Sequence, residues 1–214
     1  MTSSANVYDE LAESWYSHRH YTRFRAELEA LAARWRGGRL LNIGCGHGPD
    51  FLPFTGGAFD LCGLDSSREM LRYGHKYAAK FRFSAALVQG DAVRLPFRNC
   101  SFDHAIAIAV YHHIRGKEGR LQAYRELGRV LRPGGEAFIT VWDLARRPVF
   151  VGRQERSVPW RVGGKTVERY VYVYGPNELR KELTASGFRI LSQQPRLSLL
   201  RPFYRNLTFL VARV

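Results

Sequence analysis

Three glycines alternate along residues 40–48, which read LLNIGCGHG, directly after a short apolar run. Alternating glycines indicate a backbone that adopts unusual dihedral angles or that another molecule approaches closely. An apolar strand, a glycine loop and a helix in this order bind ligands at the carboxyl edge of a parallel sheet. The segment therefore predicts an α/β fold with a binding site at Gly44, Gly46 and Gly48.

Apolar runs alternate with helical patterns on both sides of this loop. The predicted strands are residues 40–43, 58–64, 85–89, 102–110, 136–142, 188–192 and 207–211. Helical patterns cover residues 11–35, 49–54, 66–81, 119–131 and 177–186. Strands that alternate with helices are typical of a parallel α/β sheet.

Two segments fall outside this alternation, and we expect both to lie over the active edge. Residues 1–36 are predicted to form an N-terminal helical lid. Residues 144–176 are rich in Arg, Gly and aromatic side chains, with VPW at 158–160 and RYVYVY at 169–174. We interpret this stretch as an insertion, so that residues 1–214 form a single domain.

Positive charge is concentrated in the last third of the chain. The formal net charge is +14, and 28 of the 33 basic residues are Arg. Residues 144–214 hold 14 basic residues and only 4 acidic ones. Because Arg binds phosphate bidentately and stacks on bases, this excess favours a nucleic-acid partner. A generally basic proteome is the alternative explanation.

Targeting and metal-binding patterns are weak. No apolar run approaches the roughly 18 residues of a membrane span. The N-terminus lacks the basic start and apolar middle of a signal peptide. Cys45, Cys62 and Cys100 are far apart, which predicts neither a disulfide framework nor a zinc knuckle. We therefore expect a cytoplasmic protein that holds no metal.

The spacing of the glycines disfavours a phosphate ligand. A dinucleotide-binding loop has the pattern GxGxxG, and its third glycine would fall at Pro49. No GK[ST] follows, so the Walker A pattern is also absent. S-adenosylmethionine has no phosphate, and its methionine tail lies across the loop, where alternate glycines let the backbone pass closely.

Polar residues end the next two strands. Asp65 follows the second strand, where a carboxylate can accept both ribose hydroxyls of a nucleoside. Asp91, in GDAVRLPF at 90–97, can accept the adenine amine, and Ala92 can offer its backbone amide to the ring. The alternative is that these are ordinary polar residues at strand ends, but three signals in order favour a nucleoside site.

These motifs, together with GLDSS at 63–67 and RVLRPGG at 129–135, resemble class I S-adenosylmethionine-dependent methyltransferases. The resemblance implies a single Rossmann-like α/β domain, with a mostly parallel seven-stranded sheet and helices on both faces. It implies S-adenosyl-L-methionine as cofactor. The residues implied to contact it are Gly44, Cys45, Gly46, Gly48, Asp65, Ser66, Asp91, Ala92 and Val110. The position two before the first glycine, usually acidic in that family, is Asn42 here.

Four further segments resemble the tRNA wobble-uridine carboxymethyl methyltransferases. They are YDELAESWYSHRHYTRF at 8–24, AVYHHIRGKEGRLQA at 109–123, VWDL at 141–144, and the VPW and RYVYVY pair. The resemblance implies that the chain methylates a carboxymethyl group on the wobble uridine of a tRNA. The product is a methyl ester.

A carboxylate acceptor is already ionised at pH 7, so the reaction needs alignment and fixed donors rather than a strong base. Arg19 and His112 are the catalytic donors that we predict. The predicted substrate contacts are Trp142, Trp160, Arg169 and Tyr170, because aromatics interleaved with Arg suit unpaired bases. A solvated helix face around Arg19 and a half-buried hydrophobic loop are the alternatives.

The edge strand at residues 85–89 is short, apolar and uncharged, and such an edge needs a cover. The resemblance implies a small zinc-ribbon activator protein that pairs with it. Two other functions remain open. One is a quinone- or sterol-type methyltransferase, whose correlate is an apolar lid. The other is an inactive methyltransferase-fold subunit that binds RNA.

Overall fold

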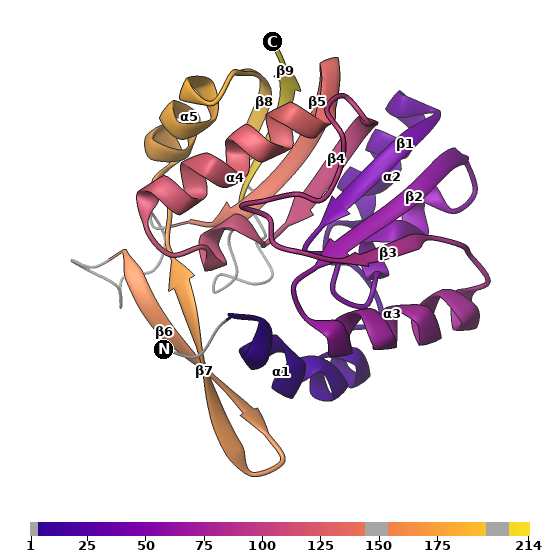
Figure 1. Ribbon diagram of the computed structural model, residues 1–214, viewed down its shortest axis with the longest axis vertical. Helices are drawn as coiled ribbons and strands as arrows, with labels where there is room; N and C mark the ends of the chain where they lie inside the picture. The colour runs from indigo at the N-terminus through magenta and orange to yellow at the C-terminus, as the bar shows by residue number, and fades with distance from the viewer. Residues whose placement is uncertain (1–3, 144–153, 196–205) are drawn as a thin grey trace.

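The computed structural model describes residues 4–143, 154–195 and 206–214 (Figure 1). One sheet runs through it, in the order β3-β2-β1-β4-β5-β9-β8. All neighbouring strands are parallel except β9, which is antiparallel to both β5 and β8. The predicted mostly parallel seven-stranded sheet is confirmed. The strands are β1 (Gly37–Ile43), β2 (Ala58–Asp65), β3 (Ala86–Gln89), β4 (Phe102–Ile108), β5 (Leu131–Trp142), β8 (Phe188–Pro195) and β9 (Asn206–Arg213).

Helices cover both faces of the sheet. One face is covered by α4 (Lys117–Val130) and α5 (Pro176–Ala185) (Figure 1). These two helices bury apolar side chains such as Leu127 and Leu183 in the core. On the other face α2 (Arg25–Trp35), η1 (Pro49–Phe54) and α3 (Arg68–Phe81) do the same. Ser67 caps α3 by accepting the Met70 amide at 3.0 Å, as the early serines predict. Neither face is left for solvent, which explains the nearly continuous apolar strands.

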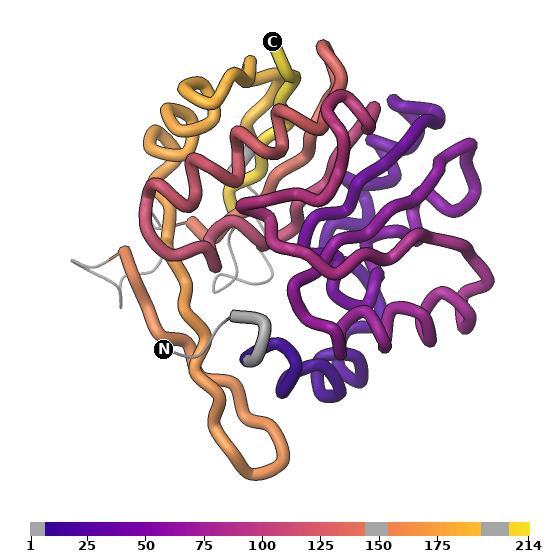
Figure 2. Tube along the Cα trace, viewed as in Figure 1, coloured from indigo at the N-terminus to yellow at the C-terminus, as the bar shows by residue number. Residues whose placement is uncertain are grey.

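The N-terminal helical segment differs from the prediction. One helical pattern over residues 11–35 becomes two helices, α1 (Ser4–His18) and α2 (Arg25–Trp35). The side chains of His47 and Tyr77 bind the backbone carbonyls of Arg19 and His20, which would otherwise accept helical hydrogen bonds. Helix α2 then joins the core. Helix α1 lies against α3 and the hairpin of β6 (Glu155–Val162) and β7 (Lys165–Tyr172) (Figure 2), so of the two helices only α1 remains a candidate for the predicted lid.

One contact across this break predicts a pH effect on stability. Burial raises the pKa of Asp50 from its ordinary 3.8 to about 6, although the Thr22 hydroxyl opposes the shift. The folded state favours the neutral acid, so stability falls as the pH rises from 4 to 6 and stays low above 6. We expect Asp50→Asn to raise the free energy of unfolding by about 1–2 kcal/mol at pH 8.

Chemical denaturation at pH 8 and pH 4 measures this. The two proteins should converge at pH 4, where the aspartate is largely neutral. The exposed Asp60→Asn serves as the matched control and should show little difference at either pH. A variant that is less stable than wild type at pH 8 would contradict the expectation.

A second, separate sheet is the hairpin of β6 (Glu155–Val162) and β7 (Lys165–Tyr172). Its turn is Gly163-Gly164, both with positive φ, which suits a two-residue hairpin loop. The hairpin projects from the body beside α1 (Figure 2). Its apolar side chains Trp160, Val162 and Val167 pack in one cluster with those of α1. It lies in the predicted insertion 144–176, of which residues 144–153 are outside the described part.

Other elements also differ from the sequence patterns: β1 starts at Gly37 rather than at residue 40, and β4 ends at Ile108 rather than at residue 110. Residues 49–54 form a 3-10 helix, and β5 starts at Leu131 rather than at residue 136. The register between β4 and β5 shifts between Phe102 and His104, which absorbs the RPGG residues into the strand. A Cβ on Gly135 would lie 2.9 Å from the Asp103 carbonyl oxygen, so only glycine fits there. Within the described ranges, no helix combines the length and the apolar character that crossing a membrane requires.

Candidate active site

The three glycines of the loop after β1 all have positive φ, at 63°, 54° and 92° for Gly44, Gly46 and Gly48. A Cβ on Gly44 would lie 2.4 Å from Val110, whose side chain closes over it. A Cβ on Gly46 would find only the Met70 sulfur, at 4.0 Å. Packing therefore requires glycine at position 44, whereas position 46 leaves room that a ligand can take.

Asp65 connects this loop to the end of β2. Its Oδ2 accepts the Gly46 amide at 2.8 Å and its Oδ1 accepts the Ser67 amide at 2.9 Å. The residue is only 9% exposed, and burial raises its pKa, although the two amide bonds oppose that shift. Each carboxylate oxygen keeps a second lone pair, so the group can still accept ribose hydroxyls. The sequence prediction for Asp65 is compatible with this geometry.

Cys45 and Ser66 are also predicted as cofactor contacts, and they lie next to Gly46 and Asp65 in the chain. Cys45 is buried, and burial raises the pKa of its thiol well above the ordinary value, so it is no nucleophile. The Ser66 carbonyl accepts a hydrogen bond from the Gln89 side chain at 3.1 Å. That bond ties the Asp65 turn to the end of β3.

Asn42 tests whether the site fits S-adenosylmethionine. It is fully buried at the end of β1, and neither its Oδ1 nor its Nδ2 has a hydrogen-bond partner in the described part of the chain. A buried amide without partners is rare in proteins and indicates a missing ligand or water. The methionine end of the cofactor carries both a donor ammonium and an acceptor carboxylate. The room over Gly46, the Asp65 carboxylate and this amide fit the cofactor.

On the adenine side, Asp91 is exposed and its Oδ1 accepts the Val93 amide at 3.0 Å. Ala92 is buried in the core. Asp91 therefore closes the turn after β3 through the amides of Val93 and Arg94. Both predicted residues lie where the sequence placed them, directly beyond a strand end.

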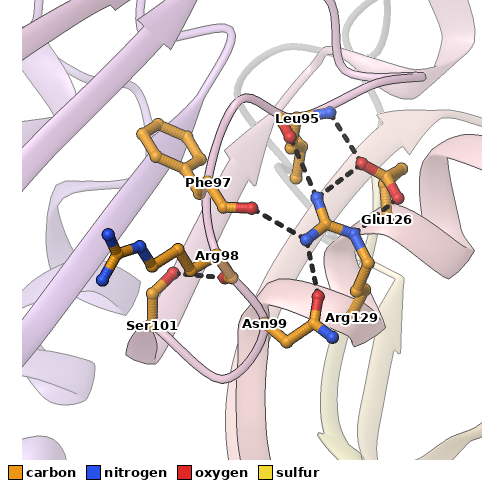
Figure 3. A network of polar contacts seen from close by, with 7 residues as sticks. All are labelled: Leu95, Phe97, Arg98, Asn99, Ser101, Glu126 and Arg129. Atoms are coloured by element: carbon orange, nitrogen blue, oxygen red, sulfur yellow. Dashed lines mark hydrogen bonds and ion pairs between the residues drawn. The ribbon is translucent and has the colours of Figure 1, made fainter.

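Arg129 organises the loop that continues from this turn (Figure 3). Its Nε and one Nη donate to the two carboxylate oxygens of Glu126, each at 2.8 Å. The remaining donors reach the carbonyls of Leu95 and Phe97 and the side chain of Asn99 at 2.8–2.9 Å. All five guanidinium N–H groups are thus used. Arg129, the first arginine of the RVLRPGG motif, therefore holds residues 95–99 to α4.

We expect Arg129→Ala to lower the free energy of unfolding by about 2–3 kcal/mol, because it strands two backbone carbonyls and a partly buried carboxylate. Thermal and chemical unfolding measure the loss. Arg125→Ala, on the same helix with an exposed Glu118 partner, is the matched control and should cost well under 1 kcal/mol. Equal losses in the two variants would contradict this role.

Helix α1 and the β6–β7 hairpin bring together three of the residues that the sequence predicted as catalytic or substrate-binding. The Trp15 and Trp160 rings lie 5.0 Å apart. The Arg19 guanidinium lies 3.8 Å from the Trp15 centroid, and that of Arg169 lies 5.0 Å from Trp160. The Trp160 indole also donates to Ser14 at 3.3 Å. Arg19, Trp160 and Arg169 therefore meet around Trp15, which the sequence reasoning did not select.

Arg169 is unusual among the cations of the chain. It is 6% exposed, and within the described ranges no carboxylate lies within 4.0 Å of it and its Nε has no acceptor. Burial raises the pKa of the nearby Tyr8 hydroxyl to about 12, and the positive charge of Arg169 opposes that rise. A buried charge normally has a partner, because desolvation is costly. The geometry suits an anionic ligand.

The paired histidines occupy different positions. His112 is fully buried, with its ring 5.4 Å from that of Trp142, so these two predicted residues form a second group. His113 accepts the Tyr8 hydroxyl at Nε2 and donates from Nδ1 to the Tyr170 carbonyl, at 2.9 and 2.8 Å. Burial lowers its pKa to about 4, so it is neutral at pH 7.

The sequence reasoning preferred His112 and missed the roles of Tyr8 and His113, which join α1 to β7. The YDELAESW segment was the available signal for Tyr8. Tyr170 is also predicted as a substrate contact, but its side chain is on the other side of β7 from that of Arg169. Adjacent residues of a strand face opposite sides. The Arg115 guanidinium lies 4.3 Å from the Tyr170 ring.

Comparisons with known proteins agree with this geometry. A family model described as "Methyltransferase domain" matches residues 40–135. The Encephalitozoon cuniculi protein named "Putative methyltransferase ECU09_1500" is 30% identical over 199 residues, which span 84% of this chain and 90% of that protein. The CcbJ methyltransferase of Streptomyces caelestis has the same fold, with a TM-score of 0.80 over the whole of both chains at 14% identity.

Relatives with a named tRNA substrate match over shorter stretches. A tRNA (carboxymethyluridine(34)-5-O)-methyltransferase of Xenopus tropicalis is 37% identical over 140 residues, 64% of this chain but 20% of that protein. The Arabidopsis thaliana protein of the same name is 35% identical over 138 residues, 31% of its length. The glycine loop, the Asp65 turn and the full-length match together carry the conclusion. The chain belongs to the class I S-adenosylmethionine-dependent methyltransferases.

Proposed function

We propose that this methyltransferase esterifies the carboxymethyl group of a wobble uridine in tRNA. The observation that carries the proposal is Arg169, a buried cation that has no carboxylate partner in the described part of the chain. The names of the Xenopus and Arabidopsis relatives support the choice of acceptor. The basic residues of 144–214 support a polyanionic substrate.

The residues around Arg169 are suited to a carboxylate acceptor. S-adenosylmethionine supplies an electrophilic methyl group on its sulfonium. An acceptor carboxylate oxygen held here would take this methyl group, and the electron pair of the broken carbon–sulfur bond would stay on sulfur. Arg169 and Arg19 orient the carboxylate, and the Trp15 and Trp160 rings keep water from it. The ionised carboxylate has no proton to lose, so the reaction does not need a general base. A His113 side chain that is neutral at pH 7 is compatible with this chemistry.

The remaining predicted contacts would hold the nucleotide. Trp142 lies at the end of β5 beside His112, where an indole can stack on a base. Arginines of the last third would contact the RNA backbone, and that binding should weaken with salt. Tyr170 lies on the other side of β7 and is not part of the acceptor site in this proposal.

A synthetic anticodon stem–loop with 5-carboxymethyluridine at the wobble position tests the proposal. Labelled methyl transfer should occur to this RNA and not to the same stem–loop with uridine. Mild alkali should release the label, since a methyl ester is alkali-labile whereas a C- or N-methyl group is not. Label that survives alkali, or transfer to the uridine control, would overturn the proposal.

A partner is also part of the proposal. Strand β3 (Ala86–Gln89) lies at the edge of the sheet, with Leu87 and Val88 half-buried. An edge of this kind suits strand addition by a small zinc-ribbon activator protein. Co-expression with such a protein should raise both the yield and the methylation rate. An isolated chain that is equally soluble and active without it would contradict this part.

A further inference from the structure

We infer that His47, in the cofactor loop, is a positioning residue for Arg19. The inference deepens the proposed function, because it rests on Arg19 facing the acceptor. His47 follows Gly46 directly, and Arg19 is the first residue after α1. The two are linked through the backbone of the α1–α2 connection and not through the Arg19 side chain.

The bond between them defines the state of the histidine. His47 Nε2 lies 2.7 Å from the Arg19 carbonyl oxygen, and a carbonyl can only accept, so Nε2 carries the proton. The ring is fully buried, with the Tyr16 and Tyr77 rings 5.3 and 5.1 Å away. Burial lowers the pKa of His47 to about 4, which keeps it a neutral donor in this one tautomer at pH 7.

Two more contacts hold the same short connection. The Tyr77 hydroxyl donates to the His20 carbonyl, and the Asp50 carboxyl interacts with the Thr22 hydroxyl, which opposes the rise in its pKa. Tyr77 belongs to α3 and Asp50 to η1, so residues of the cofactor-binding half hold three positions between 19 and 22. The backbone of this connection is therefore held to the glycine loop at one point, through His47, and to η1 and α3 at two others.

The far end of α1 is held in a similar way. Asp9 Oδ1 accepts the Ser67 hydroxyl at 2.6 Å and the Glu69 amide at 3.1 Å. Ser67 in turn donates its amide to Asp65. Helix α1 is thus tied to both cofactor-binding segments, at Asp9 and at Arg19. A glycine loop ordered by the cofactor therefore orders the guanidinium that stacks on Trp15.

A double-mutant cycle tests the inference on the full chain. His47→Phe keeps a ring and removes the donor. We expect it to lower kcat for the carboxymethyluridine stem–loop about tenfold, with the S-adenosylmethionine Kd changed less than threefold. In an Arg19→Ala background the same change should add almost no further loss. His47→Gln, whose amide can donate, should restore most of the rate. Equal losses in both backgrounds would overturn the inference.

Amide hydrogen exchange separates this inference from the proposed function. With S-adenosylhomocysteine present, His47→Phe should exchange faster than wild type across residues 19–24 and equally in β4 and β5. This readout needs no acceptor, so it decides the role of His47 even if the stem–loop is not methylated. Unchanged exchange at residues 19–24 would refute the inference, and faster exchange throughout the domain would show a general loss of stability instead.

Discussion

Gly46→Val is expected to abolish S-adenosylmethionine binding while the domain stays folded. The position has φ of 54°, and a Cβ there would meet nothing closer than the Met70 sulfur at 4.0 Å. The cost within the fold is therefore the strain of positive φ, about 1–2 kcal/mol. The cofactor tail needs the same room, so a branched side chain excludes it.

Calorimetric titration and thermal unfolding, taken together, measure these two effects. Gly134→Val is the matched control, because Gly134 has φ of 73° and nothing within 4 Å. It should show the same cost in stability and no change in affinity. Gly44→Ala should fail differently, by losing stability, because its Cβ would lie 2.4 Å from Val110. A folded Gly46→Val protein with unchanged affinity would remove the loop from the cofactor site.

Arg169→Gln is expected to reduce kcat/KM for the carboxymethyluridine stem–loop by about 10- to 150-fold. The range corresponds to the 1.5–3 kcal/mol of a hydrogen bond to a charged group. Cofactor affinity should stay within threefold, since Arg169 contacts Tyr8 and the indoles and not the glycine loop. The free energy of unfolding should be unchanged or higher, because a buried charge without a carboxylate partner is replaced by a neutral amide.

The test is whether Arg169→Gln lowers kcat/KM without lowering the free energy of unfolding. Steady-state methylation is compared with chemical denaturation of the same variant, and Arg125→Gln, exposed on α4, serves as the control for general loss of positive charge. A variant that loses activity and stability together would indicate a structural role for Arg169. Unchanged kcat/KM would show that the acceptor carboxylate binds elsewhere.

Local motifs explain what the sequence could predict. The glycine loop and the Asp91 turn follow their strands within two residues and Asp65 is the last residue of β2, so a short pattern defines all three. The seven strands and the Ser67 cap are also local in this sense. The cofactor prediction is confirmed because it depends on these segments alone.

Contacts between distant residues explain what was missed. The Tyr8–His113 bond joins residues 105 apart in the chain, and no periodic pattern marks either as a partner of the other. The break between α1 and α2 has a similar cause. Residues 19–24 fit a helical pattern, but the side chains of His47 and Tyr77 bind backbone carbonyls there instead. Long-range contacts override local helical preference there.

The position of β9 has a consequence for how the domain assembles during synthesis. Strand β8 leaves the ribosome before β9, yet β9 lies between β5 and β8 and pairs with both. Until residues 206–213 emerge, β8 has no neighbouring strand to pair with, and the free edge of β5 is open to other nascent chains. A slow stretch of translation just before these codons would lengthen that exposure, so chaperone dependence should be greatest in this interval.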